Sequence, residues 1–276
     1  VLHTAPHTLI DGFLLKPSIG IYIIEDDDHD LTRMLNLAKI ARDSLKGSLK
    51  SDKLCFYSFY DELYRDTIMH NKFLEDQIVI GQRNNEFVPY FQPKFNTQTK
   101  QVVGAEALAR WIRPDGTIIG PGVFIPIAEE SGLIANIDRS MFRSVCKLQR
   151  DMIDQGLEVV PVSVNLSRQT LHDTSFVQEY IQTLEKYNLP MDLVQLEITE
   201  STLFRNQKKF SHVIDMLHRS GFKLLMDDFG IGYSSLMMLK SMPVSTMKLD
   251  KSLIDDCNHE KGFKIVTSVI SLAKSL

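Results

Sequence analysis

The sequence predicts an α/β fold built around a mainly parallel β-sheet. Apolar, strand-like runs recur six times between residues 87 and 252, and helical stretches separate most of them. Strands that alternate with helices are typical of βα units, whose strands lie parallel in one sheet. With 43% hydrophobic and 24% charged residues, the composition is that of an ordinary globular protein. Six strands over about 200 residues fit either an open doubly wound sheet or a (β/α)8 barrel that is cut short.

The elements of this region can be assigned in order. The expected strands are FVPYFQP, QVVGAEALARW, VVPVSVNLS, LVQLEITES, FKLLMDDFG and VSTMKLDKS. The main helices between them are SMFRSVCKLQRDMIDQG, FVQEYIQTLEKYN and KKFSHVIDMLHRSG. Neither a low-complexity tract nor a short solenoid repeat interrupts this order.

A different pattern occupies residues 1–70. The run SIGIYII is β-branched and apolar, as in a strand, and EDDDHD after it favours a solvated charged turn over a metal site. The residues that follow have helical apolar spacing, and KLCFYSF favours a closing strand. From residue 60 onward one or two helices are expected, because no Gly or Pro lies between Gly47 and Gly81. We therefore divide the chain into residues 1–70 and 71–276.

Charge and cysteine content exclude several classes of protein. The net charge of -4 argues against a protein built to bind DNA or RNA.

No apolar run reaches the roughly eighteen residues of a membrane span, and residues 1–10 lack a signal-peptide pattern. Cys55, Cys146 and Cys257 are odd in number and far apart, so we expect no disulfide framework and a cytoplasmic location. The start at Val1 rather than Met favours a fragment of a longer protein.

Polar side chains stand at the ends of five successive strands. Functional residues of parallel α/β folds gather where strands end and loops begin. Strand alternation puts Glu106, Leu108 and Arg110 on one face of their strand. The polar residues expected at this edge of the sheet are Glu106, Arg110, Asn165, Glu197, Glu200, Asp227, Asp228, Lys248 and Asp250.

This set of residues suggests a metal site. Four of the five strands supply carboxylates, and so many acids together are unfavourable unless a positive charge lies among them. Carboxylate and amide oxygens suit Mg²⁺ or Mn²⁺ better than zinc. The adjacent Asp227 and Asp228 can bind two ions, and paired ions about 3.5–4 Å apart promote phosphoester hydrolysis. Lys248 and Arg110 would supply further positive charge for a phosphate.

Each of these residues also has a simpler explanation. A single acid at a strand end is more often a helix N-cap or a solvated loop residue, and Lys248 alone is most often a surface lysine. Asn165 could cap the helix that follows it. The spacing of Gly230 and Gly232 is too common to indicate a phosphate loop. The metal hypothesis depends on the joint occurrence of the polar residues at five consecutive strand ends.

Taken in order, the motifs resemble those of a known family. GAEALARW, FIPIAEESGLI, VSVNLSRQ, LEITES, MDDFGIGYSSL and MKLDKS are similar to the successive motifs of EAL-domain cyclic-di-GMP phosphodiesterases. The resemblance covers about residues 84–276 and implies a (β/α)8 TIM-like barrel whose first strand is antiparallel. It also implies that cyclic di-GMP is opened to linear pGpG with Mg²⁺ or Mn²⁺, in a site for two ions.

The resemblance implies roles for single residues as well. Residues that match metal ligands are Glu106, Asn165, Glu197, Asp227 and, for the second ion, Asp228. Residues that match catalytic positions are Glu106, Lys248, whose counterpart lies near the attacking water, and Glu200, whose counterpart steadies the loop that begins at Asp227. Residues that match substrate contacts are Gln92, Leu108, Arg110 and Asp250. That loop also takes part in homodimerisation in the family, and here it carries Ile231 where members often have Thr.

Both ends of the chain depart from the family pattern. Two further strands, one with another acid in a Glu-Gly-Val-Glu stretch, complete the family's barrel, and we expect a truncated barrel because the sequence stops at Leu276. Residues 1–70 resemble more weakly the C-terminal half of a GGDEF domain. Its Gly-Gly-Asp/Glu-Glu-Phe signature is absent from the sequence, so no cyclase activity is expected.

Three functions are compatible with this pattern. The leading hypothesis is a metal-dependent cyclic-di-GMP phosphodiesterase attached to a GGDEF-like remnant. The alternative is a non-catalytic cyclic-di-GMP receptor, which the expected loss of one acid favours. A metal phosphohydrolase for another substrate is the third. Turnover, as opposed to binding alone, distinguishes the first two.

Overall fold

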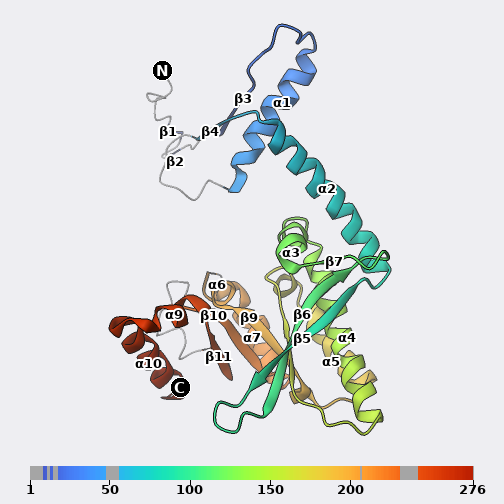
Figure 1. The fold of residues 1–276 in the computed structure, drawn as a ribbon, viewed down its shortest axis with the longest axis vertical. Coiled ribbons are helices and arrows are strands. Elements are labelled where there is room, and N and C mark those ends of the chain that lie inside the picture. Colours follow the sequence, from blue (N-terminus) through green and yellow to red (C-terminus); the bar gives the residue numbers. More distant parts are fainter. Residues whose placement is uncertain are drawn as a thin grey trace. The chain divides into compact units, whose positions relative to one another are not determined.

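The computed structural model describes residues 9–10, 13–14, 18–47, 56–205, 207–230 and 242–275 (Figure 1). Within it the chain divides into two compact units, residues 1–74 and residues 75–276, and each is described by itself. The boundary expected after residue 70 falls inside the first unit.

The first unit has the expected strand–helix–strand order. Strand β3 (Ser18–Ile21) pairs in parallel with β4 (Phe56–Phe59), and helix α1 (Leu31–Asp43) lies between them in the chain and packs on both. The other elements of this unit are β1 (Leu9–Ile10) and β2 (Phe13–Leu14), which pair antiparallel, and the 3₁₀ turn η2 (Ser44–Gly47).

The acidic segment after β3 is a charged turn, as expected. The Asp28 carboxylate accepts hydrogen bonds from the Tyr22 hydroxyl at 2.6 Å and from the Glu25 backbone N–H at 2.9 Å. Asp30 caps α1 by accepting from the Thr32 backbone N–H at 2.8 Å. The acids therefore shape the turn and begin the helix.

The helical connector predicted from residue 60 onward is one helix, α2 (Glu62–Arg83). Near the end of α2, Gly81 belongs to the second unit, and within that unit a Cβ atom at Gly81 would lie 2.8 Å from Trp111 Nε1. Trp111 is fully buried and donates to Glu86 Oε2 at 2.9 Å. None of the described helices, α2 included, has both the length and the apolar content that crossing a lipid bilayer requires.

The second unit is built on a sheet with the strand order β11-β10-β9-β8-β6-β5 (Figure 1). Its strands are β5 (Phe87–Phe95), β6 (Val102–Ile112), β7 (Ile118–Ile119), β8 (Val162–Asn165), β9 (Val194–Thr199), β10 (Leu224–Phe229) and β11 (Thr246–Leu249). Strand β5 is antiparallel to β6, β7 is a short antiparallel addition to β6, and the other pairs are parallel. The predicted six strands and the antiparallel first strand are confirmed.

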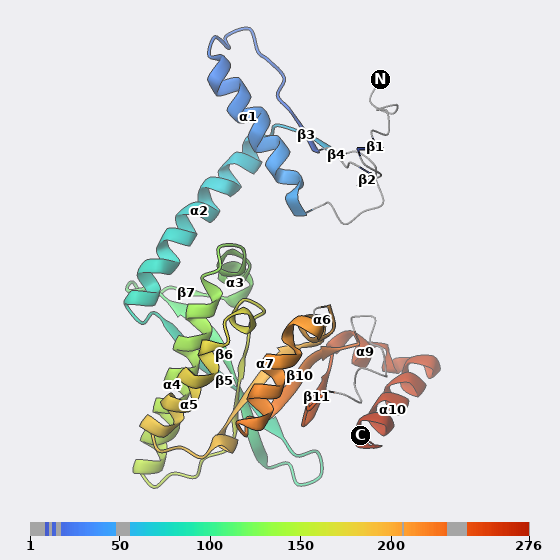
Figure 2. The same cartoon turned by 180° about the vertical axis from the view of Figure 1, so that it is seen from behind.

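Helices alternate with these strands, as predicted. They are α3 (Pro121–Glu130), α4 (Ile134–Asp154), η3 (Thr170–His172), α5 (Ser175–Lys186), η4 (Met191–Leu193), α6 (Glu200–Arg205), α7 (Gln207–Arg219), α9 (Lys251–Asp255), η5 (Asp256–Asn258) and α10 (Glu260–Ser275). Helix α4 packs against β5, β6 and β8, and α5 packs on α4 (Figure 2). Cys146 of α4 and Cys257 are free thiols, and Cys55 lies outside the described residues.

Burial of the strands' apolar residues sets the direction of their polar ones. In β9, Leu196 and Ile198 are almost completely buried. Because successive side chains of a strand point to opposite faces, this burial turns Glu197 to the other face of the sheet. In β8, buried Val162 and Val164 likewise alternate with the polar residues. The apolar pattern therefore positions the polar side chains described next.

Candidate active site

Five neighbouring strands bring polar side chains to one face of the sheet. Asn165 of β8 lies in register beside Glu197 of β9. Strand β6, the other neighbour of β8, carries Glu106, and β10 carries Asp227. Lys248 comes from β11, next to β10. The sequence prediction that successive strands would place these residues together is therefore confirmed for these five.

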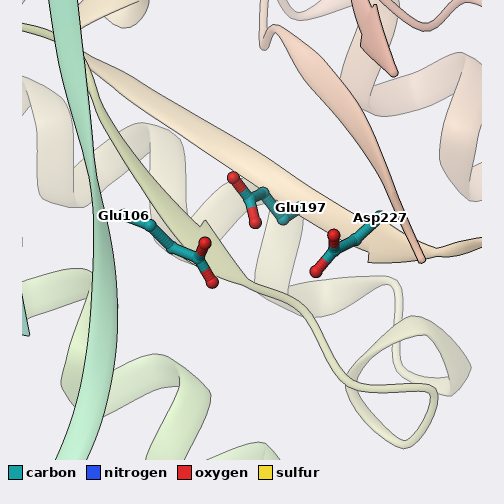
Figure 3. A group of neighbouring side chains, drawn as sticks. All are labelled: Glu106, Glu197 and Asp227. Atoms are coloured by element: carbon teal, nitrogen blue, oxygen red, sulfur yellow. The ribbon is translucent and has the colours of Figure 1, made fainter. Parts of the chain in front are cut away.

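Three carboxylates form the centre of the site, and we call Glu106, Glu197 and Asp227 the acid cluster. One oxygen from each lies within 4.8 Å of the others, and Figure 3 shows the three side chains directed toward one another from β6, β9 and β10. The Glu197 side chain is inaccessible to solvent, whereas those of Glu106 and Asp227 are 12% and 19% exposed. Three negative charges this close repel one another strongly unless cations lie among them.

Lys248 supplies one of those cations. Its Nζ donates to Glu106 Oε2 and to Glu197 Oε2, both at 2.7 Å, and lies 3.1 Å from Asp227 Oδ1. Burial acts to lower the pKa of Lys248, but hydrogen bonds and charges from Glu106 and Glu197 outweigh it and raise the pKa above its usual value. Lys248 is therefore a charged member of the site and not a surface lysine.

Asn165 also contacts the acid cluster directly. Its Nδ2 donates to Glu106 Oε1 at 3.0 Å. The simpler role considered for Asn165, capping the following helix, is wrong, because the residue at the N-cap of η3 is Gln169. The Glu106 carboxylate is thus held on one oxygen by Asn165 and on the other by Lys248.

A second lysine, Lys94 of β5, completes the site and was missed in the sequence. Its Nζ donates to Glu197 Oε1 at 2.6 Å and to Ser163 Oγ at 2.7 Å. Lys94 stands two residues after Gln92, so strand alternation puts both on the face that carries the site. This spacing is the signal that could have found Lys94.

The two lysines keep Glu197 ionised. Burial alone would raise the pKa of Glu197, but hydrogen bonds from Lys248, Lys94 and Ser163 outweigh burial and hold the pKa below its usual value. A buried carboxylate of this kind is stable only while its cationic partners remain in place.

Asp228 lies at an irregular point of the backbone of β10. Its φ is +56°, in the left-handed region, and the pairing of β10 with β11 shifts register between Met226 and Phe229. The pKa of Asp228 is raised, first by burial and then by the charges of Asp227 and Asp250. In the part of the chain that the structure describes, the closely spaced carboxylates do not take in Asp228, so its expected role at a second ion stays a prediction.

Two further acids of the predicted set contact backbone groups. Glu200, the first residue of α6, is buried, and its Oε2 accepts from the Gly230 backbone N–H at 2.7 Å. Asp250 caps α9 and accepts from the Ser252 backbone N–H at 2.8 Å and from the Ser252 hydroxyl. Hydrogen bonds from Ser252 lower the pKa of Asp250. Ile231, Gly232 and the rest of residues 231–241 lie outside the described residues.

The residues expected to contact substrate lie along β5 and β6. Gln92 pairs in register with Glu106, and Leu108 pairs with Tyr90. The Arg110 guanidinium lies 5.7 Å from the centre of the Tyr90 ring and donates to the Ala109 carbonyl at 2.9 Å. These side chains share the strand pair that carries Glu106 and Lys94, and their contacts with a substrate stay a prediction.

The acid cluster has the donors that a divalent metal ion needs. It offers oxygens from three carboxylates, and Asn165 adds an amide beside them. Oxygen donors of this kind are the ligands that Mg²⁺ and Mn²⁺ prefer. The cluster's contact with the Lys248 ammonium shows that its oxygens already converge on a cation. The residues therefore fit a divalent ion.

One more buried carboxylate, Asp138 of α4, lies beside the turn that follows Asn165. Its Oδ2 accepts from the Ser167 backbone N–H at 2.8 Å and from Thr170 Oγ1 at 2.7 Å. Burial raises the pKa of Asp138 to about 6, although these hydrogen bonds act to lower it. Asp138 was not among the residues predicted for the site, because the pattern of helix α4 is that of an ordinary amphipathic helix.

Comparison with known proteins places the chain that carries this site in a family. The EAL domain family matches residues 74–276. The signalling protein YkoW of Bacillus subtilis is 35% identical over 98% of this chain and 33% of its own length. The bifunctional diguanylate cyclase/cyclic di-GMP phosphodiesterase MucR of Pseudomonas aeruginosa is 28% identical over 95% of this chain and 38% of its own length. The chain thus spans about a third of the length of the curated relatives it matches.

Solved structures show the same domain. The PaMucR phosphodiesterase in complex with c-di-GMP is similar with a TM-score of 0.66 and 31% identity, over 72% of this chain and 83% of that chain. The sheet order, with its antiparallel first pair, and this similarity show the TIM-like EAL fold. The chain belongs to the EAL domain family.

Proposed function

We propose that this chain hydrolyses cyclic di-GMP to linear pGpG as a metal-dependent phosphodiesterase in second-messenger signalling. The observation that carries the proposal is the acid cluster, which strands β6, β9 and β10 of an EAL domain assemble around Lys248. Support comes from the related MucR, whose name includes cyclic di-GMP phosphodiesterase and whose solved domain is a c-di-GMP complex. In the reaction, a water oxygen bonds to one phosphorus, the bond from that phosphorus to a sugar oxygen breaks, and a proton passes to the leaving oxygen.

The proposed metals are two ions of Mg²⁺ or Mn²⁺. Glu106, Asn165, Glu197 and Asp227 would hold one ion, and Asp228 would contribute to the second. When bound, such ions lower the pKa of a water and neutralise phosphate charge. The chain's own part is to keep the oxygens close and ionised, as the lowered pKa of Glu197 indicates.

The remaining residues would bind and orient the substrate. Because its pKa is raised, Lys248 stays protonated near neutral pH and would act as a hydrogen-bond donor to the water or the phosphate, not as a general base. Arg110 would contact a phosphate through its planar guanidinium, which suits two parallel hydrogen bonds. Glu200 would steady the loop after Gly230 through the bond that it accepts from the Gly230 N–H. Contacts from Gln92, Leu108 and Asp250 to the nucleotide complete the proposed site.

For residues 1–70 we propose part of a GGDEF-like domain. The parallel strand–helix–strand order of β3, α1 and β4 supports this proposal. So does MucR, whose name includes diguanylate cyclase and whose match covers 95% of this chain. Homodimerisation stays a prediction.

Product analysis tests the proposed function. The purified protein is incubated with cyclic di-GMP and Mg²⁺ or Mn²⁺, and the nucleotides are separated by chromatography. We expect linear pGpG, which disappears with EDTA. Glu106→Ala should lower the rate by more than about 100-fold, because losing a group just outside a metal's ligands already costs about 10–100-fold. Glu158→Ala, which removes an exposed acid after α4, is the matched control.

The opposite outcomes are equally informative. An unchanged rate in Glu106→Ala would exclude the acid cluster as the site of hydrolysis. Intact cyclic di-GMP retained by the wild-type protein would overturn the enzymatic proposal and favour a receptor. Neither binding nor turnover would leave only a metal phosphohydrolase with another substrate.

A further inference from the structure

The two oxygens of Glu197 are held by different lysines. Oε2 accepts from Lys248, whose ammonium also contacts Glu106 and Asp227. Oε1 accepts from Lys94 at 2.6 Å. Thus Oε2 faces the rest of the acid cluster, while Oε1 is engaged by a cation from a different strand.

Lys94 is anchored in place by a second partner. Its ammonium donates to Ser163 Oγ at 2.7 Å, and this serine is fully buried between Glu106's strand and Glu197's strand. The Ser163 hydroxyl in turn donates to the Ala105 carbonyl at 3.3 Å, so its lone pairs remain directed at Lys94. The Lys94 side chain is 31% exposed, whereas the Glu197 side chain that it contacts is inaccessible to solvent. Lys94 and Ser163 therefore fix the orientation of the Glu197 carboxylate.

The way a carboxylate is held decides which metal ions it can bind. A carboxylate with both oxygens free can chelate an ion through both, and Ca²⁺ accepts this with its 6–8 ligands and flexible geometry. Mg²⁺ demands a near-ideal octahedron and takes ligand oxygens singly. A carboxylate with one oxygen already engaged can bind an ion only through its other oxygen.

We propose that Lys94 is a positioning residue that sets metal specificity. A divalent ion bound by the acid cluster would take the place of the Lys248 ammonium at Glu197 Oε2, whereas Lys94 would keep Oε1 engaged. Glu197 would then bind the ion through one oxygen only, which disfavours Ca²⁺ relative to Mg²⁺ and Mn²⁺. The inference rests on the metal site of the proposed function. It concerns the choice of ion and not the hydrolysis of any substrate, so the two can fail separately.

Metal binding to the metal-free protein tests this inference without any nucleotide. Titration calorimetry gives the affinities for Mg²⁺ and for Ca²⁺ of the wild type and of Lys94→Met. Removing a positive charge strengthens the binding of both dications, and this common effect cancels in the ratio of the two affinities. We expect the ratio of Ca²⁺ to Mg²⁺ affinity to rise about tenfold, the lower end of the effect of losing a ligand's hydrogen-bond partner.

Two further variants make the result specific. Lys94→Arg keeps a cation with several N–H donors and should restore a ratio close to that of the wild type. Lys147→Met removes an equal charge from the exposed face of α4, where the lysine side chain is 67% exposed, and should leave the ratio unchanged. If circular dichroism shows that Lys94→Met does not fold, Lys94→Leu replaces it, because this shorter apolar side chain has no donor and also releases Glu197 Oε1.

The outcomes separate clearly. Equal gains in Mg²⁺ and Ca²⁺ affinity would reduce Lys94 to a counter-charge and overturn the inference. A wild-type protein that binds neither ion would overturn it together with the metal part of the proposed function. A shifted ratio in a protein that does not hydrolyse cyclic di-GMP would support the inference and contradict only the proposed activity.

Discussion

Two buried carboxylates in the same unit, Glu197 and Asp138, have pKa values that are shifted in opposite directions. Both are nearly inaccessible, at 1% and 7% exposure. Glu197 receives hydrogen bonds from two ammonium groups, and its pKa is held below the usual value. Asp138 receives hydrogen bonds from an amide and a hydroxyl, and burial raises its pKa to about 6. The comparison teaches that neutral donors do not offset the desolvation of a buried acid here, whereas cations do.

Neutralising each acid should separate a chemical role from a structural one. Glu197→Gln removes the charge at the centre of the acid cluster and should lower hydrolysis by more than about 100-fold. Asp138→Asn should keep most of the activity, because the amide oxygen can accept both bonds that Asp138 Oδ2 accepts now. Steady-state rates with cyclic di-GMP measure both variants. Equal losses would show that the two acids do not differ in role.

Removing the cation of the acid cluster should destabilise the protein. Lys248→Met leaves three close carboxylates without their shared partner, and breaking a buried ion pair costs about 3–5 kcal/mol. We expect the free energy of unfolding in EDTA, measured with urea, to fall by about 3 kcal/mol, because Lys248 is partly exposed.

Adding Mg²⁺ to the same unfolding experiment tests whether the acid cluster binds a metal ion. It should stabilise Lys248→Met more than the wild type, because the variant's acid cluster lacks its internal cation. Lys251→Met, three positions later on the exposed surface of α9, is the control and should change little in either condition. The same gain from Mg²⁺ in all three proteins would contradict a metal site at the cluster.

The raised pKa of Asp138 should appear in the pH dependence of stability. Between the unfolded value near 3.8 and the folded value near 6, the folded state binds the extra proton, so stability decreases as pH rises through this window. A shift of about two units corresponds to about 3 kcal/mol. Asp138→Asn should abolish this decrease and be more stable than the wild type above pH 6. The free energy of urea unfolding between pH 4 and pH 7 measures it, with Asp151→Asn on the same helix as the control. A persistent decrease in Asp138→Asn would assign it to another group.

The smallest expected effect concerns the serine beside Lys94. Ser163→Ala removes one acceptor of the Lys94 ammonium, and the lost hydrogen bond should cost about 1 kcal/mol. The measurement is the midpoint of urea unfolding with an unchanged slope. Ser271→Ala, on the exposed surface of α10, should differ from the wild type by less than about 0.5 kcal/mol. No difference between the two variants would mean that Ser163 does not anchor Lys94.

Much of the site could be predicted because two simple rules converge on it. Strand alternation decides which face Glu106, Asn165 and Glu197 occupy, and parallel pairing brings neighbouring strand ends to one edge. Both rules operate on short stretches of sequence. The order of strands and helices along the chain could be predicted for the same reason, because it also depends on short stretches of sequence.

The parts that were missed depend on long-range packing. Lys94 is separated by about a hundred positions from the carboxylate that it contacts, and only its spacing from Gln92 hinted at its direction. Asp138 is buried by the turn after β8, which no helical periodicity predicts. The left-handed backbone at Asp228 likewise follows from the irregular pairing of β10 with β11. Such features depend on how elements meet and are not encoded in any single element.

The antiparallel β5–β6 pair has a consequence for the order of folding. Its two strands are joined by the turn of residues 96–101, in which the Asn96 side chain accepts from the backbone N–H groups of Gln98 and Thr99. Closing so short a loop loses little chain entropy, whereas each parallel pair must wait for a whole crossover to be ordered. We therefore expect this hairpin to form early, with Lys94 and Glu106 already on one face. The remaining acids would then be added strand by strand to a hairpin that already presents the Lys94 ammonium beside Glu106.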